Sequence, residues 1–185
     1  MATAATFTTT ASTQSVVSAN LRPVLTMIVC AGLPMGIFGL VNLVFESLGV
    51  LPLFFAPFGL PGWAGGAIHL FQLALLGGAF WALLDARADR ATRLWLAAFT
   101  SAYILLPFIT PPLDSLQLGI LCSSLFLLAL AALRRAGAAS PLAGWLMAPV
   151  LSVLGLSAAM GLVITAAYTP PFALIQGQNP VPPAA

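Results

Sequence analysis

All six Lys and Arg residues of this chain are arginines, and they lie before the first of five long apolar runs or between two of these runs. One precedes the first run, three lie between the second and third runs, and two lie between the fourth and fifth; they are Arg22, Arg87, Arg90, Arg93, Arg134 and Arg135. If the chain crosses a membrane five times, all six lie on one side, which the positive-inside rule makes the cytoplasmic side. We therefore predict five spans, with the N-terminus in the cytoplasm and the C-terminus outside.

The composition supports the same class. Hydrophobic residues make up 61% of the chain and charged residues 5%, and the mean hydropathy is +1.06. A soluble domain carries charge on about a quarter of its residues, whereas a span needs roughly 20 apolar ones. The sequence predicts an all-α integral membrane protein, a five-transmembrane-helix bundle with spans over about residues 22–45, 63–85, 93–110, 113–134 and 141–168.

The segments outside these spans lack the pattern of a membrane helix. Residues 1–20 are rich in Ala, Thr and Ser without the basic start and apolar core of a signal sequence, so we expect a disordered cytoplasmic tail. Residues 170–185 contain five prolines and predict a disordered C-terminal tail. Residues 47–62 contain three prolines and several Phe, which predicts a long outer loop.

Several classes of function are disfavoured. The sequence contains no nucleotide-binding loop, no zinc-binding His-Glu pair and no second His to serve a nucleophile. The net charge of +2 is too low for a nucleic-acid surface, and no carboxylate or Lys lies well inside a span to relay protons. Cys30 and Cys122 fall within spans and are expected to be apolar filler. A non-catalytic protein is favoured over an enzyme, and Arg without Lys favours a bacterial origin.

Small residues recur at helical spacing in three spans, where they permit close approach of two helices. Those in the first span are Gly32, Gly36 and Gly39; those in the second are Gly62, Gly66, Ala74 and Gly78; those in the fifth include Gly155 and Ala159. We expect these residues to form contacts between helices. A homodimer face is a second interpretation.

Two carboxylates outside the predicted membrane interior have expected structural roles. Asp114 follows two prolines and is expected to cap the fourth helix. Asp89 and Arg93 have i,i+4 spacing, which predicts a solvated ion pair.

His69 is the only histidine and lies about two turns inside the second span, with Gln72 three residues further along the same face. Both side chains are expected to point into the bundle, because polar side chains avoid lipid. One interpretation of His69 is a hydrogen bond between helices, for example to Tyr103. A second is contact with a polar ligand, and a third is ligation of haem or another tetrapyrrole metal.

Aromatic side chains gather where the long loop meets the spans. They are Phe45, Phe54, Phe55, Phe58 and Trp63. They fit an aromatic belt at the membrane interface, and they also fit a lid over an apolar pocket between the helices. The two interpretations are compatible.

From the second span onward, the chain resembles the TspO/MBR family, the tryptophan-rich sensory proteins related to the translocator protein. Pro-Gly-Trp at 61–63 is similar to the opening of that family's second helix, Pro-Phe at 107–108 to its Trp-Ser-Pro-Leu-Phe-Phe element, and Ser-Pro-Leu-Ala-Gly-Trp-Leu at 140–146 to its final helix. The resemblance covers roughly residues 33–168. It implies five spans and a long first loop folded over a ligand pocket.

The residues that form the family's pocket are mostly replaced here. The family's aromatic and Asn positions correspond to His69, Leu73, Ala102, Leu105, Val150, Val153 and Gly161, and its small ligand-facing position corresponds to Ser157. The family is associated with binding porphyrins and sterols and, in some bacterial members, with tetrapyrrole degradation. The resemblance therefore implies a retained scaffold with an altered pocket.

We predict that the protein binds a flat apolar ligand under the outer loop, for sensing, binding or transport. The ligand would be a tetrapyrrole such as haem, or an isoprenoid such as a sterol. The candidate ligand-binding residues are Trp63, His69, Gln72, Tyr103 and Ser157, with His69 as the polar anchor; no catalytic residue or metal ligand is assigned. One alternative is a structural or assembly subunit of a larger membrane complex. Another is an enzyme that holds a porphyrin for light- or oxygen-dependent chemistry.

Overall fold

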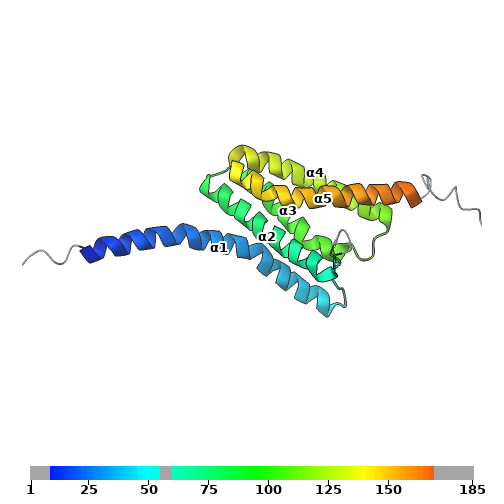
Figure 1. Ribbon diagram of the computed structural model, residues 1–185, viewed down its shortest axis with the longest axis horizontal. Coiled ribbons are helices and arrows are strands. Elements are labelled where there is room, and N and C mark those ends of the chain that lie inside the picture. The colour runs from blue at the N-terminus through cyan, green and yellow to red at the C-terminus, as the bar shows by residue number, and fades with distance from the viewer. Residues whose placement is uncertain (1–8, 55–59, 169–185) are drawn as a thin grey trace, which may run out of the picture.

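The computed structural model describes residues 9–54 and 60–168, and in this part of the chain it contains five helices and no strand. The helices are α1 (Thr9–Ser47), α2 (Gly62–Asp85), α3 (Arg90–Ile109), α4 (Ser115–Ala139) and α5 (Pro141–Tyr168). Successive helices run antiparallel. Helices α2 to α5 form a bundle, and α1 lies along α2 at its side (Figure 1).

All five helices are long and apolar enough to cross a membrane. The candidate spans are Leu21–Ser47, Gly62–Asp85, Arg90–Ile109, Ser115–Ala139 and Pro141–Ala167. Large hydrophobic side chains are exposed along the outside of the bundle, as expected where lipid replaces water. The predicted bundle of five membrane helices is confirmed, and the chain is an integral, multi-pass membrane protein.

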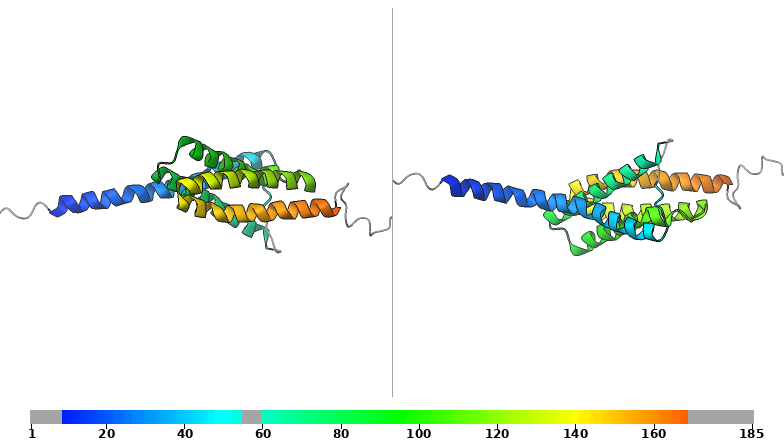
Figure 2. Two further views of the ribbon diagram at one scale, coloured as in Figure 1. Left: turned by 90° about the horizontal axis from the view of Figure 1, so that it is seen from above. Right: turned by 90° about the horizontal axis from the view of Figure 1, so that it is seen from below.

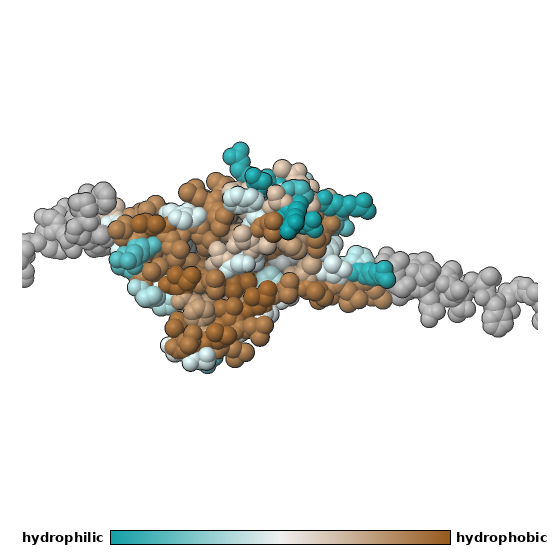
Figure 3. Space-filling model, turned by 180° about the vertical axis from the view of Figure 1, so that it is seen from behind, coloured by the Kyte–Doolittle hydropathy of each residue, from teal (hydrophilic) through white to brown (hydrophobic). Residues whose placement is uncertain are grey.

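Exposed arginines gather at one end of the bundle. Arg87 and Arg90 lie where α2 turns into α3, and Arg134 and Arg135 lie near the turn from α4 to α5. Figure 3 shows hydrophilic side chains grouped in one region above a largely hydrophobic surface. We call this the arginine end, and we call the opposite end, where residues 48–54 and 110–114 connect helices, the loop end.

The first helix begins earlier than the sequence predicted. It starts at Thr9, so the expectation of a disordered tail over residues 1–20 is wrong for residues 9–20, which extend past the bundle as helix (Figure 2). Adding a residue to an existing helix fixes few dihedrals for one new hydrogen bond, so a strong apolar helix can continue into a segment containing Ala, Gln and Ser. Residues 1–8 and the predicted tail over 170–185 lie outside the described residues.

The two carboxylates at helix starts both act as N-caps. Asp114 Oδ1 accepts a hydrogen bond from the Gln117 N–H at 2.8 Å, and Gln117 Oε1 accepts one from the Asp114 N–H at 3.2 Å, so the predicted cap is confirmed. Asp89 accepts bonds from the Thr92 hydroxyl at 2.5 Å and the Thr92 N–H at 3.1 Å. These bonds, with the hydroxyl foremost, lower the pKa of Asp89 from its ordinary value of 3.8.

The predicted ion pair between Asp89 and Arg93 is wrong. As the N-cap, Asp89 directs its carboxylate to the third residue of the helix, Thr92, rather than to the fourth. Arg93 Nε is buried without a hydrogen-bond partner among the described residues.

Helix α1 approaches α2 at Gly77, which is not among the small residues expected above to form contacts between helices. A Cβ added at Gly77 would lie 2.1 Å from the Cys30 carbonyl oxygen and 2.7 Å from Ala31 Cα. By contrast, a Cβ on Gly32, Gly36 or Gly39 would meet nothing within 4 Å, so the expectation that these three contact another helix is wrong within the described chain. The span Leu21–Ser47 of α1 has apolar residues on every side, and its pattern therefore does not indicate which face packs.

Helices α4 and α5 are joined by a single residue and stay close along their length. Ser140 connects them, and its hydroxyl accepts a bond from the Ala143 N–H at 3.5 Å. A Cβ on Gly144 would lie 3.1 Å from Gly137 Cα, and a Cβ on Gly161 would lie 3.0 Å from Gly119 Cα. Glycine thus permits close approach near both ends of this helix pair.

Large side chains fill the bundle toward the arginine end. Leu83, Leu96, Phe99 and Met147 are among the largest fully buried side chains. They come from α2, α3 and α5 and lie in the halves of those helices nearer the arginine end. Among the described residues, a cavity lies on the other side of this packed layer, toward the loop end.

Candidate ligand-binding site

A cavity of about 280 Å³ lies among α2, α3, α4 and α5 toward the loop end. Each helix contributes residues from its half nearer that end, and the described part of the 48–61 loop contributes Leu53 and Phe54. The helical residues that line it are Gly65, Ile68, His69, Gln72, Tyr103, Leu106, Pro107, Leu118, Cys122, Val153, Leu154, Ser157, Met160, Gly161 and Ile164, with Thr110 just beyond α3. The lining is mostly apolar and contains no charged group, which suits an apolar ligand.

Gln72 and Tyr103 form a buried polar pair across α2 and α3. The Tyr103 hydroxyl donates a hydrogen bond to Gln72 Oε1, and Gln72 Nε2 donates to the Pro149 carbonyl oxygen of α5 at 3.4 Å. Tyr103 is 3% exposed and Gln72 is 2% exposed. The interhelical hydrogen bond that the sequence suggested for His69 is thus made by Gln72, and it ties three helices together at the wall of the cavity.

His69 is held by rings rather than by hydrogen bonds. Its imidazole stacks on Tyr103 with ring centroids 4.6 Å apart, and it packs at a tilt against Phe38 at 5.2 Å and Phe54 at 5.6 Å. The residue is 6% exposed, and Nε2 has no hydrogen-bond partner among the described residues. A buried polar atom without a partner is uncommon in proteins and requires an explanation.

The loop is attached over the cavity by its backbone. The Leu53 N–H donates to the Pro107 carbonyl oxygen at 2.8 Å. In a continuous helix that carbonyl would accept a bond from residue 111, but residue 111 is Pro and has no N–H. Pro111 therefore leaves the carbonyl of residue 107 without its helical donor at the end of α3, and the loop amide of Leu53 binds it.

An aromatic cluster continues from the loop onto α1. Phe45 stacks on Phe108 with centroids 4.7 Å apart, and Phe38 lies 5.5 Å from Phe108 and 6.1 Å from Phe54. Phe45 and Phe54 thus lie in the predicted aromatic group. Phe55 and Phe58, which the sequence also placed there, are outside the described residues.

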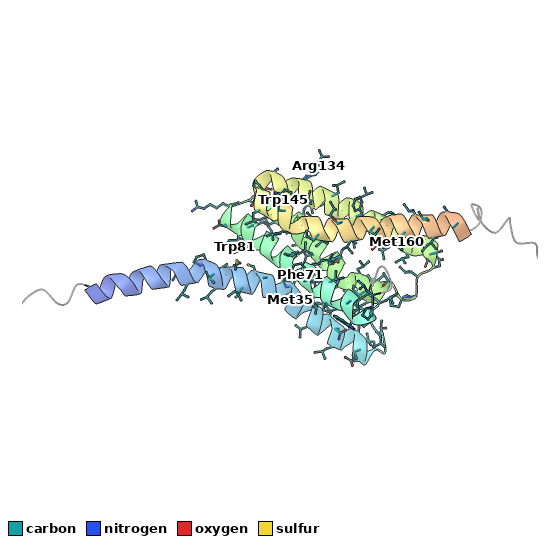
Figure 4. The ribbon with its side chains drawn as sticks, viewed as in Figure 1. Met35, Phe71, Trp81, Arg134, Trp145 and Met160 are labelled. Atoms are coloured by element: carbon teal, nitrogen blue, oxygen red, sulfur yellow. The ribbon has the colours of Figure 1, made fainter. Side chains whose placement is uncertain are left out.

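The cavity also reaches the outer surface of the bundle along α5. Met160 and Ile164 line it, yet they are 43% and 44% exposed. Figure 4 shows Met160 toward the loop end of α5, with Trp145 and Arg134 near the other end of the bundle. Both side chains lie within the candidate span Pro141–Ala167.

Four of the five predicted ligand-binding residues meet at the cavity. His69, Gln72, Tyr103 and Ser157 all line it, and the Ser157 hydroxyl donates to the Val153 carbonyl oxygen at 2.9 Å. Trp63 is not among the lining residues and is 77% exposed. At about 100° per residue, position 63 lies nearly opposite the α2 face that carries Gly65, Ile68, His69 and Gln72.

Sequence reasoning missed most of the apolar lining. Val153 and Gly161, which the resemblance had marked as pocket positions, line the cavity, and stepping by three or four residues from His69 and Ser157 would also have reached Gly65, Met160 and Ile164, because such residues share a helix face. Phe38 and Cys122 come from other helices, and nothing in their local sequence marks them as neighbours of the site. Cys122 and Cys30 are both free thiols.

The described residues contain no group of three or more His, Cys, Asp or Glu side chains that would hold a metal ion. No protein-family model matches this chain, and no curated protein or solved structure matches it. The likeness to the TspO/MBR family therefore remains a prediction from the residues quoted above.

Proposed function

We propose that this protein binds an apolar small molecule in the cavity under the 48–61 loop, to sense, store or move it. The observation that carries the proposal is an uncharged apolar cavity with one buried imidazole nitrogen left unpaired at its wall. Ligand pockets have this make-up: mostly apolar walls with a few polar groups that fix orientation. We further propose that the chain is a divergent TspO-like protein in which a tetrapyrrole or an isoprenoid occupies this site.

The route to the site follows from its position. Met160 and Ile164 belong both to the cavity wall and to the lipid-facing surface, so an apolar molecule can pass between bilayer and cavity without crossing water. With the arginine end in the cytoplasm, as the positive-inside rule requires, the cavity opens to the outer half of the membrane. The N-terminus then lies in the cytoplasm and the C-terminus outside.

Cys122 provides a direct measure of occupancy. In a Cys30→Ala background it is the only thiol, and it lines the cavity with 5% exposure. We expect protoporphyrin IX or a bacterial isoprenoid to slow the labelling of Cys122 by a lipid-soluble maleimide, and this protection should saturate with ligand concentration.

The matched control moves the thiol to the lipid-facing side of the same helix. In Cys30→Ala/Cys122→Ala/Leu127→Cys the thiol stands at a position that is 64% exposed and outside the cavity. Its labelling should not respond to the ligand. If no probe protects Cys122, or if both thiols are slowed equally, the binding function is refuted.

One observation favours a second candidate, a structural or assembly subunit. Gly32, Gly36 and Gly39 of α1 face open space, and glycines at such spacing allow another membrane helix to approach closely. A Gly36→Leu substitution should then abolish crosslinking to a neighbouring membrane protein in native membranes and leave the protection of Cys122 intact. Crosslinks that persist unchanged in Gly36→Leu would count against this candidate.

A further inference from the structure

Most polar side chains around the cavity have a hydrogen-bond partner, and one buried atom does not. The hydroxyls of Thr110 and Ser157 each donate to a backbone carbonyl, and Gln72 and Tyr103 bond to each other. His69 Nε2 alone among the buried polar side-chain atoms of the lining has no partner within the described residues. His69 itself lines the cavity, so the polar group of a ligand that reaches this side chain would supply the partner that Nε2 lacks.

We infer that the ligand is an uncharged, slender apolar molecule carrying a single hydroxyl or carbonyl group, which hydrogen-bonds to Nε2 of His69. This inference rests on the proposed binding function and narrows its ligand class. A neutral imidazole has one N–H donor and one acceptor nitrogen, so either tautomer can bind a hydroxyl, whereas a carbonyl requires the N–H at Nε2. The ring contacts of His69 with Phe38, Phe54 and Tyr103 hold the nitrogen in place.

The uncharged lining disfavours molecules of the same shape that carry an ionised group. Among the described residues, the lining contains no Arg or Lys to pair with a carboxylate or phosphate, and no Asp or Glu to pair with an amine. Moving an unpaired charge from water into an apolar site is strongly unfavourable. An alcohol is therefore favoured over the corresponding acid or phosphate ester.

Size favours a slender molecule over a macrocycle. The cavity of about 280 Å³ lies at the lower limit of ligand pockets, which span roughly 300–1,000 Å³. An isoprenoid alcohol of sesquiterpene size suits this space. A tetrapyrrole would have to displace Leu53 and Phe54, and with them the hydrogen bond from Leu53 to Pro107.

The test uses three molecules that differ only in the polar end. Farnesol has a hydroxyl, farnesene has none, and farnesoic acid is anionic. Each is titrated into Cys30→Ala protein in phosphatidylcholine nanodiscs. The concentration that gives half-maximal protection of Cys122 is expressed as the concentration of the molecule in the bilayer, so that the three midpoints can be compared. Farnesol should protect at about tenfold lower concentration than either of the others, because only farnesol pairs the buried nitrogen at no charge cost.

Variants at His69 assign the preference to its nitrogen. His69→Phe keeps an aromatic ring against Phe38 and Tyr103 but cannot hydrogen-bond, and it should bring the midpoints for farnesol and farnesene within about twofold of each other. His69→Gln, which restores a hydrogen-bonding group, should recover part of the preference for farnesol.

The outcomes separate this inference from the binding function. With His69 in place, farnesol and farnesene can both protect Cys122 saturably with equal midpoints. That result overturns the inference but leaves the binding function standing, and it needs no His69 variant. A preference for farnesol that survives in His69→Phe also overturns the role of His69. If none of the three molecules protects Cys122, while protoporphyrin IX does, the ligand class is wrong; if nothing protects it, the binding function fails as well.

Discussion

The contact of α1 with α2 at Gly77 leads to a quantitative prediction. Replacing Gly77 by Ala would place a Cβ 2.1 Å from the Cys30 carbonyl oxygen, and both neighbouring atoms of α1 are backbone. Non-bonded carbons normally lie about 3.5 Å from their neighbours, so α1 has to retreat by roughly 1.4 Å. Overpacking of this kind costs about 1–3 kcal/mol, and a backbone obstacle, which cannot rotate away, favours the upper part of that range.

The neighbouring glycine provides a matched control in the same helix. A Cβ on Gly78 would lie 3.5 Å from Leu146 Cδ1, which is an ordinary van der Waals contact. Alanine is also the better helix former, by up to about 1 kcal/mol. Gly78→Ala should therefore leave the free energy of unfolding unchanged or raise it slightly.

The prediction is tested by reversible unfolding in mixed micelles of SDS and a mild detergent, followed by circular dichroism. Gly77→Ala should lower the free energy of unfolding by about 2–3 kcal/mol relative to Gly78→Ala. It should also weaken ligand protection of Cys122, because displacement of α1 moves Phe38 away from His69. Equal stability of the two variants would refute the packing of α1 on α2 described above.

Two further predictions concern polar groups. Tyr103→Phe leaves Gln72 Oε1 buried without a donor and should lower the free energy of unfolding by about 1–3 kcal/mol. The double variant Tyr103→Phe/Gln72→Met removes the unpaired oxygen as well and should recover most of this loss, measured by the same unfolding titration in SDS. The bonds from Thr92 lower the pKa of Asp89 in the folded protein below its ordinary value of 3.8. The ionised carboxylate therefore contributes its full stabilisation above pH 3.8, and this contribution is lost as the pH falls through the pKa of the folded state. The difference in free energy of unfolding between wild type and Asp89→Asn should accordingly shrink as the pH falls below 3.8. A difference that stays constant with pH would contradict the role of ionised Asp89 as the cap.

The membrane helices were predictable because their signal is local and strong. Charge-free runs of about 20 residues leave few other folds open, and prolines and carboxylates mark several helix ends, as Asp114 illustrates. The start of α1 was not predictable in the same way. Residues 9–20 lack apolar periodicity, and their helix continues from the span that follows them.

The candidate site was predictable only where a polar residue stands out in an apolar span. His69 and Gln72 were placed correctly because lipid excludes polar side chains from the outer faces of the helices. Trp63 was misplaced because an aromatic residue at a helix start fits both a pocket and a membrane interface. The pairing of Phe38 with His69 depends on how two apolar helices are rotated against each other, and apolar residues on every side leave that rotation unmarked.

Pro111 has a consequence for how the wall of the proposed binding site can change. Because Pro111 has no N–H, the carbonyl of residue 107 accepts a bond from the main chain at Leu53, so the attachment of the loop does not depend on which side chains the loop carries. Substitutions of Leu53 or Phe54 can therefore reshape the cavity wall one residue at a time while the loop stays attached, with Leu53→Pro as the exception because it removes the donor. For the proposed binding function, single mutations in the loop can therefore change the ligand preference without redesign of the helices beneath.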